Sequence, residues 1–292
     1  MRVCFIILHY KDRMITKQCV DSIAKMDDQE NIQMIVIDND TELPDRERSI
    51  LKEQLKAYRN LHVLHMQEKS GFSRANNAGY LYARDLFKPD YMVICNNDIE
   101  FMQKDFCKRL SECYEKHPFF VLGPDVVDSA SGAHQNPMDT RLRTKKEADY
   151  TIRMNRVGLK FYSVLYPFFL WNQKRLEEQR QRRNENDSIQ TFQEKIVPCG
   201  ACLIFSSDFC ERERKAFEPE TEFYYEEYLL AYRCKQKGYQ IIYDPDLKVM
   251  HHSGRATNKS FKSRKKRQRF VMEKTAEACE VYRKILCQKN QL

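Results

Sequence analysis

The sequence predicts an α/β fold in which a mostly parallel sheet is flanked by helices. Apolar runs typical of buried strands alternate with stretches of helical spacing from residue 2 to about residue 123. This alternation favours a parallel sheet with right-handed crossovers. Polar side chains follow several of the apolar runs, as they do at the ligand-binding edge of open α/β sheets. A chain of 292 residues is long enough for one domain with an appended segment.

The expected elements follow from apolar runs, helical spacing and the turn residues between them. Strands are expected at residues 2–8, 32–37, 61–66, 91–95, 196–205 and 239–243. Helices are expected at residues 16–26, 44–58 and 73–87, from about residue 223, and late in the basic C-terminal stretch. Gly200 falls inside an expected strand, which indicates close approach by a backbone or a ligand.

Composition is that of an ordinary globular protein, with 42% apolar and 32% charged residues. No stretch reaches the roughly 18 uncharged apolar residues of a membrane-spanning helix. The N-terminal apolar run is brief and is followed by His9 and Tyr10 rather than a cleavage site, so we expect a first strand. Eleven irregularly spaced cysteines favour reduced thiols in the cytoplasm.

Positive charge is concentrated late in the chain. The net charge is +8, and Lys and Arg gather at residues 174–183 and 262–269. Such runs usually form solvated faces, although they also suit an anionic membrane surface or nucleic acid. No base-stacking motif accompanies them, so we expect no nucleic-acid partner.

Asp98 is the first candidate for chemistry. The uncharged run at residues 91–95 stops at Asn96-Asn97-Asp98, which supplies oxygen atoms at the end of a predicted strand. A hard divalent cation takes such oxygen ligands together with substrate phosphates. The alternative is a polar turn, because Asn and Asp also dominate turns.

Other polar groups are expected at the same edge as Asp98. His9-Tyr10 and Asp38-Asn39 follow the first two predicted strands, and parallel strands end on the same side. Residues 70–79 lie at a helix start, where free backbone N–H groups and Arg74 suit a phosphate. The stretch matches neither the dinucleotide fingerprint nor a P-loop.

Three later features remain open from residues alone. Residues 158–171 are aromatic and almost uncharged, which fits either a helical hairpin packed on the main domain or a membrane interface. Glu226 and Glu227 begin a predicted helix, where acids complement the dipole and one of them is free to face a cleft. His251 and His252 follow the last predicted strand, which suggests a metal ligand.

These motifs, in this order, resemble glycosyltransferase family 2, the inverting enzymes of the GT-A fold, and within it the rhamnosyltransferase-like bacterial branch. The similar segments are residues 36–41, 71–79, 96–98, 198–202 and 223–227, followed by His251. Their joint order is more specific than any one motif. The resemblance implies a Rossmann-like GT-A domain over residues 1–255, with a helical and aromatic insertion at about 140–194. A basic helical segment would follow at 256–292.

The resemblance also implies roles for individual residues. Glu227 stands where the family has the Asp that acts as base, and the longer side chain leaves the choice between Glu226 and Glu227 open. Asp98 and His251 would hold Mg²⁺ or Mn²⁺ on a diphosphate. Gly200 and Ala201 would lie on the acceptor side. The implied donor-binding residues are His9, Tyr10, Asp38, Asn39, Gly71, Phe72, Arg74, Asn76 and Asn97.

The implied activity is inverting transfer of a sugar from a UDP- or dTDP-linked donor to a glycan or lipid-linked acceptor in cell-surface polysaccharide synthesis. The implied location is the cytoplasm, with peripheral contact at the inner membrane face. A sugar-nucleotide nucleotidyltransferase is the alternative enzyme, although residues 9–12 lack the glycines of a triphosphate-binding loop. A catalytically inactive nucleotide-sugar-binding relative is the other alternative.

Overall fold

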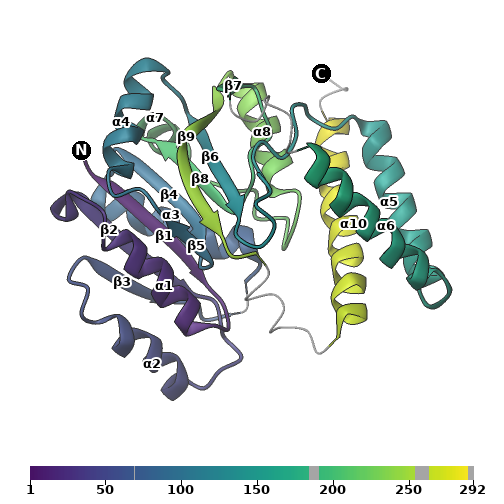
Figure 1. The fold of residues 1–292 in the computed structure, drawn as a ribbon, viewed down its shortest axis with the longest axis horizontal. Coiled ribbons are helices and arrows are strands. Elements are labelled where there is room, and N and C mark those ends of the chain that lie inside the picture. Colours follow the sequence, from purple (N-terminus) through teal and green to yellow (C-terminus); the bar gives the residue numbers. More distant parts are fainter. Residues whose placement is uncertain (69, 184–190, 254–262, 289–292) are drawn as a thin grey trace.

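One curled sheet with helices on both faces forms the body of the molecule (Figure 1). The computed structural model describes the chain except residues 69, 184–190, 254–262 and 289–292. The strands are β1 Val3–His9, β2 Ile32–Asp38, β3 Leu61–His65, β4 Tyr91–Asn96, β5 Ile99–Phe101, β6 Val121–Asp128, β7 Gln193–Glu194, β8 Cys202–Ser206 and β9 Ile241–His251. Their order is β3-β2-β1-β4-β8-β6-β9-β5, and β7 pairs with β9.

Side-chain caps mark the beginning of two of the helices. Asp12 caps α1 by accepting hydrogen bonds from the backbone N–H groups of Met14 and Ile15. Thr144 and Glu147 form a capping box at the start of α5. The helices are α1 Arg13–Ile23, η1 Gln29–Asn31, α2 Asp45–Leu55, α3 Phe72–Phe87, α4 Phe106–Lys116, α5 Lys145–Lys160, α6 Tyr162–Arg183, α7 Ser207–Arg212, α8 Glu226–Lys237 and α10 Arg264–Gln288.

Side-chain alternation along the strands gives the sheet two buried faces. Phe5 on β1 belongs to a core that α1, α2 and α4 cover, whereas Ile6 belongs to a core covered by α3, α7 and α8. Gly79 lets α3 approach the sheet, because a Cβ there would lie 2.7 Å from both Ile6 and Ile37. The predicted α/β class with a mostly parallel sheet is confirmed.

The strand ends align at one edge of the sheet. β1 pairs in parallel with β2 and with β4, so that His9 lies opposite Asp38 and Leu8 opposite Asn96. β8 runs antiparallel between β4 and β6, which brings its start to the same edge. β6 is parallel to β9, and His251 at the end of β9 lies opposite Asp128. The predicted convergence of polar groups therefore extends across the sheet.

Two expected strands have different bounds in the structure. The strand expected at 196–205 begins only at Cys202, so the expectation that Gly200 lies inside it is wrong. Val197 pairs instead with Asp139, and the Cys199 N–H donates to Asn136 Oδ1 at 3.0 Å, so these residues are bound by the segment at 136–139. The strand expected at 239–243 continues to His251, because β9 resumes its pairing with β6 after a bulge.

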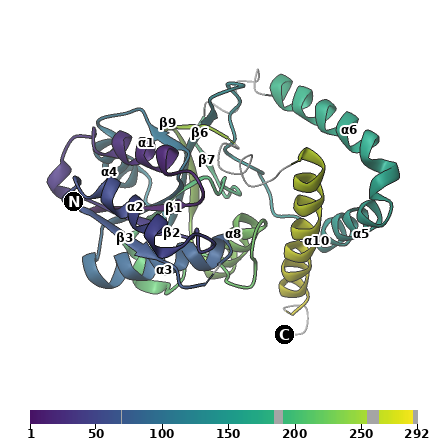
Figure 2. The same ribbon diagram turned by 90° about the horizontal axis from the view of Figure 1, so that it is seen from below.

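Helices α5, α6 and α10 form a helical group beside the sheet (Figure 2). α5 packs along α10, where Tyr282 Oη donates to the Arg143 carbonyl at 2.8 Å and Cys279 is buried. α6 folds back across α5, since a Cβ on Gly158 would lie 2.9 Å from Phe169 Cζ. Among the described helices, none is long and apolar enough to cross a membrane.

Candidate functional site

Asp98 and His251 meet at the edge where β4 and β9 end. The two side chains are nearly buried, and His251 Nε2 lies 3.1 Å from Asp98 Oδ1. β5 sets this geometry, because Ile99, the residue after Asp98, lies opposite His251 in an antiparallel pair. The sequence hypothesis that these two residues act together therefore has a geometric basis.

Gln135 orients the imidazole of His251. Gln135 Nε2 donates to Ser253 Oγ at 2.9 Å, and the amide oxygen lies 2.7 Å from His251 Nδ1. Because an amide oxygen only accepts hydrogen bonds, Nδ1 carries a hydrogen and Nε2 is the ring nitrogen directed at Asp98. An imidazole nitrogen and a carboxylate oxygen therefore face each other, and both are atoms that commonly ligate divalent cations. The donor set therefore fits a divalent metal.

Two protein ligands leave most of a cation's coordination sphere to other groups. Within the described residues, no cluster of three or more His, Cys, Asp and Glu side chains is placed to hold a metal ion. Mg²⁺ and Mn²⁺ sites commonly combine one or two protein ligands with substrate phosphates and water. Asp98 and His251 are thus better suited to a metal bound together with a diphosphate than to a permanent structural metal.

Glu227 lies beside Gly200 at the start of α8. A Cβ on Gly200 would lie 2.5 Å from Glu227 Oε1, so only glycine leaves room for this carboxyl group. Burial raises the pKa of Glu227, and a backbone hydrogen bond from Gly200 acts in the opposite direction. A carboxylate with a raised pKa is a good proton acceptor. This is the environment expected of a general base.

Glu226 differs from its neighbour in its hydrogen bonding. Its Oε2 atom is buried and has no hydrogen-bond partner. Burial and the charge of Glu227 raise the pKa of Glu226 well above its ordinary value, which favours the neutral acid. Tyr224 and Tyr225, which precede this pair, have positive φ angles of 70° and 63°. Such backbone conformations are uncommon outside glycine and often occur at functional sites.

The backbone connects the Glu227 region with the Asp98 region. The Asn96 N–H donates to the Ala201 carbonyl at 3.0 Å, so the residues before β8 lie against the end of β4. Gly200 contacts Glu227, and Asp98 follows Asn96 by two residues. Gly200, Ala201, Asp98, His251 and Glu227 therefore belong to one region of the sheet edge.

Two side chains of the protein already hydrogen-bond to Asp38. Arg48 Nε donates to Asp38 Oδ2 at 2.9 Å, and His65 Nδ1 lies 2.7 Å from the same oxygen. Burial alone would raise the pKa of Asp38, but the hydrogen bonds from His65 and Arg48 lower it. A direct contact between Asp38 and a nucleotide, as the resemblance implies, stays a prediction.

His9 and Asn97 belong to one buried hydrogen-bond network. Thr16 Oγ1 donates to the Asp12 carbonyl, accepts from Asn97 Nδ2 at 2.9 Å and lies 2.6 Å from His9 Nδ1. Burial lowers the pKa of His9, so the imidazole is neutral near pH 7. Both residues hold the ends of β1 and β4 against α1.

The remaining predicted donor-binding residues surround the start of α3. Asn39 exchanges two hydrogen bonds with the Ser70 backbone at 2.6 and 3.2 Å. A Cβ on Gly71 would lie 2.3 Å from the Glu222 carbonyl, which also accepts from the Phe72 N–H. These contacts hold the loop before α8 on α3.

The three other residues have contacts of their own. Arg74 Nε donates to the Pro219 carbonyl, and the buried Asn76 donates to the Phe72 carbonyl while its Oδ1 has no partner. Tyr10 is half-buried, with Lys11 Nζ 5.1 Å from its ring centre. Their roles toward a donor stay predictions.

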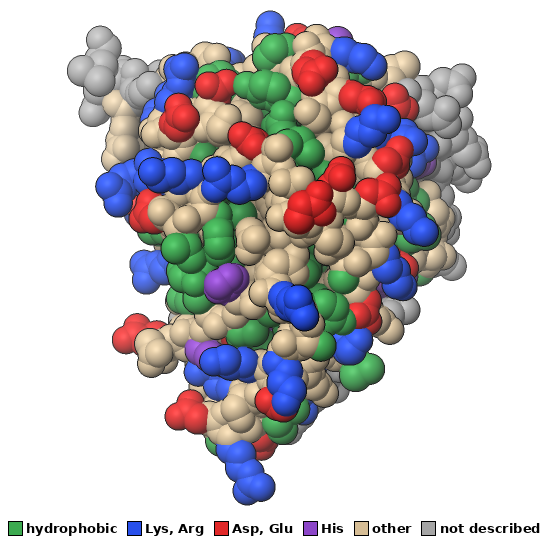
Figure 3. Space-filling model, turned by 90° about the vertical axis from the view of Figure 1, so that its left-hand side faces the viewer, with side chains coloured by type: hydrophobic (Ala, Val, Ile, Leu, Met, Phe, Trp, Pro, Cys, Tyr) green, Lys and Arg blue, Asp and Glu red, His purple; other side chains and the backbone are tan. Residues whose placement is uncertain are grey.

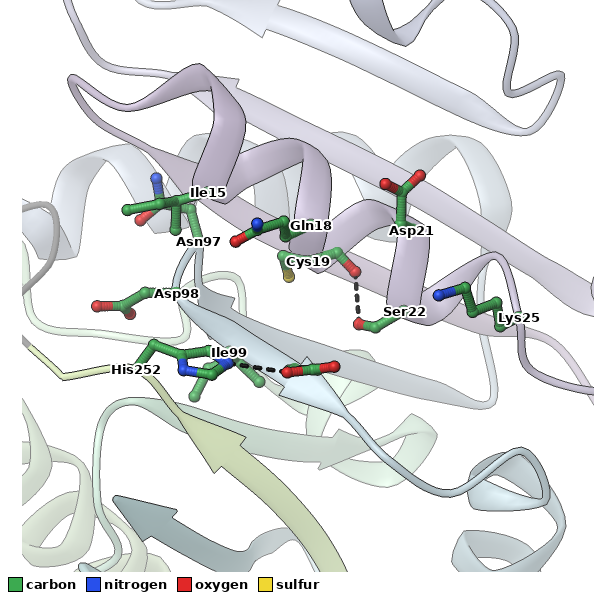
Figure 4. Close-up of a pocket in the computed structure, with 11 residues that line it drawn as sticks. Ile15, Gln18, Cys19, Asp21, Ser22, Lys25, Asn97, Asp98, Ile99 and His252 are labelled. Atoms are coloured by element: carbon green, nitrogen blue, oxygen red, sulfur yellow. Dashed lines mark hydrogen bonds and ion pairs between the residues drawn. The ribbon is translucent and has the colours of Figure 1, made fainter. Parts of the chain in front are cut away.

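A pocket of about 340 Å³ opens beside Asp98, between α1 and β5. Asp98, Asn97 and His252 lie at one end and Lys25 at the other (Figure 4). His252 Nε2 lies 2.8 Å from Glu100 Oε2 within the pocket. Asp98 thus forms part of the wall of this pocket, and its carboxyl group points away from the Lys25 end (Figure 4).

Sequence reasoning missed Arg48, His65 and Gln135, which hold Asp38 and His251. Each acts across a separation of 10 to 116 residues, and none belongs to a motif. Asp40 was also missed, although both of its carboxylate oxygens are buried without a hydrogen-bond partner and Lys11 Nζ lies 3.4 Å away. Asp40 lies shortly after a predicted strand, His65 within a predicted strand and Arg48 within a predicted helix, whereas Gln135 lies in no predicted element.

Arg48→Met should destabilise the fold by about 3–5 kcal/mol, because it leaves the buried Asp38 carboxylate without its guanidinium partner. The free energy of unfolding in urea measures this loss. Arg46→Met is the matched control, since Arg46 lies exposed on the same helix and should change stability by less than about 0.5 kcal/mol. Equal stability of the two variants would show that Asp38 does not depend on Arg48.

The described surface carries no large area of one charge sign on the face in Figure 3. Lys and Arg side chains there are interspersed with Asp and Glu. A nucleic-acid site would require a continuous basic surface.

Comparison with known proteins identifies both a family and a fold. The model of the family described as "Glycosyl transferase family 2" matches residues 4–218. No curated protein shows detectable similarity to the chain. The similar solved structures include S. aureus TarS 1-349, with a TM-score of 0.53 and 14% identity over 89% of this chain and 63% of that one. TarS in complex with UDP-GlcNAc has a TM-score of 0.54 at 14% identity, over 90% of this chain and 62% of that one.

A third similar structure comes from Pyrobaculum calidifontis. It is the mannosyltransferase PcManGT in complex with GDP-Man and Mn²⁺, with a TM-score of 0.53 and 13% identity. The match covers 95% of this chain and 69% of that one. At these identities the similarities show a shared GT-A fold, and this chain spans less than two thirds of the TarS chains.

Proposed function

The chain belongs to glycosyl transferase family 2, and from this premise we propose that it is a metal-dependent, inverting glycosyltransferase. It takes a sugar from a nucleotide diphosphate, UDP- or dTDP-linked, and passes it to a glycan or lipid-linked acceptor in cell-surface polysaccharide synthesis. The observation that carries this proposal is the contact between Asp98 and His251 at the sheet edge, with Glu227 beside Gly200 in the segment that pairs with the end of β4.

Glu227 performs the proton transfer in this proposal. Its carboxylate takes the proton of the acceptor hydroxyl as that oxygen attacks the anomeric carbon from the face opposite the leaving diphosphate. Gly200 and Ala201 lie beside the acceptor, because Gly200 already contacts Glu227. One displacement inverts the anomeric centre, so no covalent intermediate on the protein is required.

Asp98 and His251 would hold Mg²⁺ or Mn²⁺ on the donor diphosphate. When bound, the metal neutralises the charge that develops on the departing nucleotide diphosphate. Gln135 contributes by keeping His251 Nε2 directed at Asp98. Support for a metal comes from this donor set and from PcManGT, whose structure is a complex with GDP-Man and Mn²⁺.

Gln135→Leu should weaken Mn²⁺ binding about 10–100-fold, because the variant no longer fixes the His251 tautomer. Titration of the protein with Mn²⁺, followed by electron paramagnetic resonance in the presence of a nucleoside diphosphate, measures the affinity without turnover. His134→Leu is the neighbouring control, since His134 pairs with Asp125 and not with His251. If Gln135→Leu binds Mn²⁺ like the unaltered protein, Gln135 has no role in orienting the ligand.

A panel of UDP-, dTDP- and GDP-linked sugars with Mn²⁺ tests the proposed function directly. Donor binding is measured by calorimetry, and turnover by release of the nucleoside diphosphate with and without saccharide acceptors. We expect one donor to bind and to be turned over, with nuclear magnetic resonance of the product showing an inverted anomeric centre. Binding without turnover across all acceptors would favour an inactive relative, and release of pyrophosphate from a nucleoside triphosphate would favour the nucleotidyltransferase.

A further inference from the structure

Helix α6 and the residue before it carry an exposed apolar face. Phe161, Val164, Phe168 and Trp171 are spaced three and four residues apart, so they lie on one side of the helix. Their exposed fractions are 51%, 79%, 55% and 57%. Single exposed apolar residues are common on proteins, but a contiguous set of large ones is typical of an interaction surface. We call these four residues the aromatic face.

Positively charged side chains lie at both ends of the aromatic face, and the stretch of chain around it contains no acidic residue. The stretch from Tyr150 to Leu176 contains no Asp or Glu, and its charged residues are Arg153, Arg156, Lys160, Lys174 and Arg175. Lys160 Nζ lies 5.7 Å from the Phe161 ring centre, and the Arg175 guanidinium 5.7 Å from that of Trp171. Both ends of the face thus carry a positive charge stacked on an aromatic ring.

The N-terminal part of α10 packs against the other side of α6, through Lys265. Lys265 Nζ lies 5.9 Å from the Tyr162 ring centre and 5.4 Å from that of Tyr166. Tyr162 Oη also donates to the Lys265 carbonyl at 2.7 Å, which fixes the two helices together. The described residues 264–269 of α10 include four further Lys or Arg side chains, namely Arg264, Lys266, Arg267 and Arg269.

We propose that the aromatic face docks on an anionic lipid bilayer. The aromatic and aliphatic side chains would enter the interfacial layer, while Lys160 and Arg175 would contact the headgroup phosphates. Aromatic rings with adjacent cations are the usual composition of interfacial helices. α6 lies at the outer edge of the molecule, away from the sheet, so a flat membrane can reach it (Figure 2).

Charge favours a membrane over a second copy of the chain. A symmetric dimer through the aromatic face would bring two acid-free basic stretches together, and like charges at an interface oppose association. Anionic lipid supplies the opposite charge that this stretch lacks. The proposal goes beyond sugar transfer, because vesicle binding requires neither donor nor acceptor.

Vesicle co-sedimentation of the full 292-residue chain tests the proposal. We expect binding to phosphatidylcholine vesicles that contain phosphatidylglycerol, and much weaker binding to phosphatidylcholine alone. Phe168→Ser with Trp171→Ser should weaken binding at least about tenfold, because two large apolar side chains no longer enter the interface. Lys160→Gln with Arg175→Gln should lower the salt-sensitive part of binding.

The matched control replaces two equally exposed apolar residues elsewhere. Leu86 and Met102 are 56% and 59% exposed, and Leu86→Ser with Met102→Ser should bind vesicles like the unaltered chain. Val164→Glu tests the aromatic face without removing a ring, at a position that is 79% exposed, where a substitution should change stability little.

Three outcomes would overturn the proposal. They are absence of binding to anionic vesicles, equal loss of binding in the Leu86 and Met102 control, and unchanged binding after Val164→Glu. A dimer in analytical ultracentrifugation that the Phe168 and Trp171 variant converts to a monomer would identify a second copy as the occupant instead.

Discussion

Replacing Glu227 by Gln should lower the rate of sugar transfer by about 10²–10⁴-fold while leaving donor affinity unchanged. The amide keeps the size of the carboxyl group and fits beside Gly200, but it cannot accept the proton of the acceptor hydroxyl. Steady-state kinetics with the donor identified in the panel measure the rate, and calorimetry measures donor binding. A variant with undiminished turnover would remove Glu227 from the role of base.

Glu226→Gln distinguishes between the two adjacent acids. Since Glu226 is favoured as a neutral acid, exchange for an equally neutral amide should cost much less activity than the same change at Glu227. The reverse order of the two variants would assign the base to Glu226. Unfolding temperatures of both variants separate loss of chemistry from loss of fold.

The dependence of turnover on pH follows from the same carboxyl group. Burial raises the pKa of Glu227 above its ordinary value of 4.5, and only the ionised form accepts a proton. Turnover should therefore increase as pH rises through this raised pKa, so that the acidic limb of the kcat profile lies above the range of an exposed Glu. An acidic limb at or below the ordinary pKa of 4.5 would contradict a buried base.

Asp98→Ala should abolish metal-dependent turnover, with a fall of at least about a thousandfold. The metal contributes several kcal/mol of transition-state stabilisation, and each 1.4 kcal/mol or so corresponds to a factor of ten. Mn²⁺ affinity in the presence of a nucleoside diphosphate should fall with it, because His251 would be the remaining protein ligand. Paramagnetic resonance of Mn²⁺ and release of the nucleoside diphosphate measure the two losses separately.

Glu100→Ala is the control for Asp98→Ala. Glu100 lines the same pocket but pairs with His252 at 2.8 Å and lies away from His251. Its removal should leave Mn²⁺ affinity close to that of the unaltered protein. Equal losses in both variants would mean that the pocket responds to total negative charge and not to a metal ligand at position 98.

Much of the N-terminal half of the fold could be predicted from local sequence patterns. β1, β2 and β4 are short apolar runs that end at polar residues, and two-residue alternation along Phe5 and Ile6 explains the two cores. The expectation that His9, Asp38 and Asn96 align follows from parallel pairing, and the registers confirm it. The family likeness is confirmed by the match to residues 4–218.

The details of the site were less accessible, because they depend on contacts between distant segments. Pairing of Val197 with Asp139 shortens the strand before Cys202, and no periodicity reports such a contact. Arg48 and His65 engage Asp38 through tertiary packing, and Gln135 reaches His251 from another loop. Single-sequence patterns describe which residues are buried or polar, but not which polar groups partner each other.

The route of the chain between β6 and β7 has a consequence for protein engineering. The segment that contains α5 and α6 connects β6 to β7, and both of these strands pair with the same strand, β9. Its two attachment points are therefore fixed by hydrogen bonds that do not involve α5 or α6. Grafting the corresponding segment of another family member between them should yield chimaeras that keep the pairing of β6 and β7 with β9, and thus a direct test of what this segment contributes.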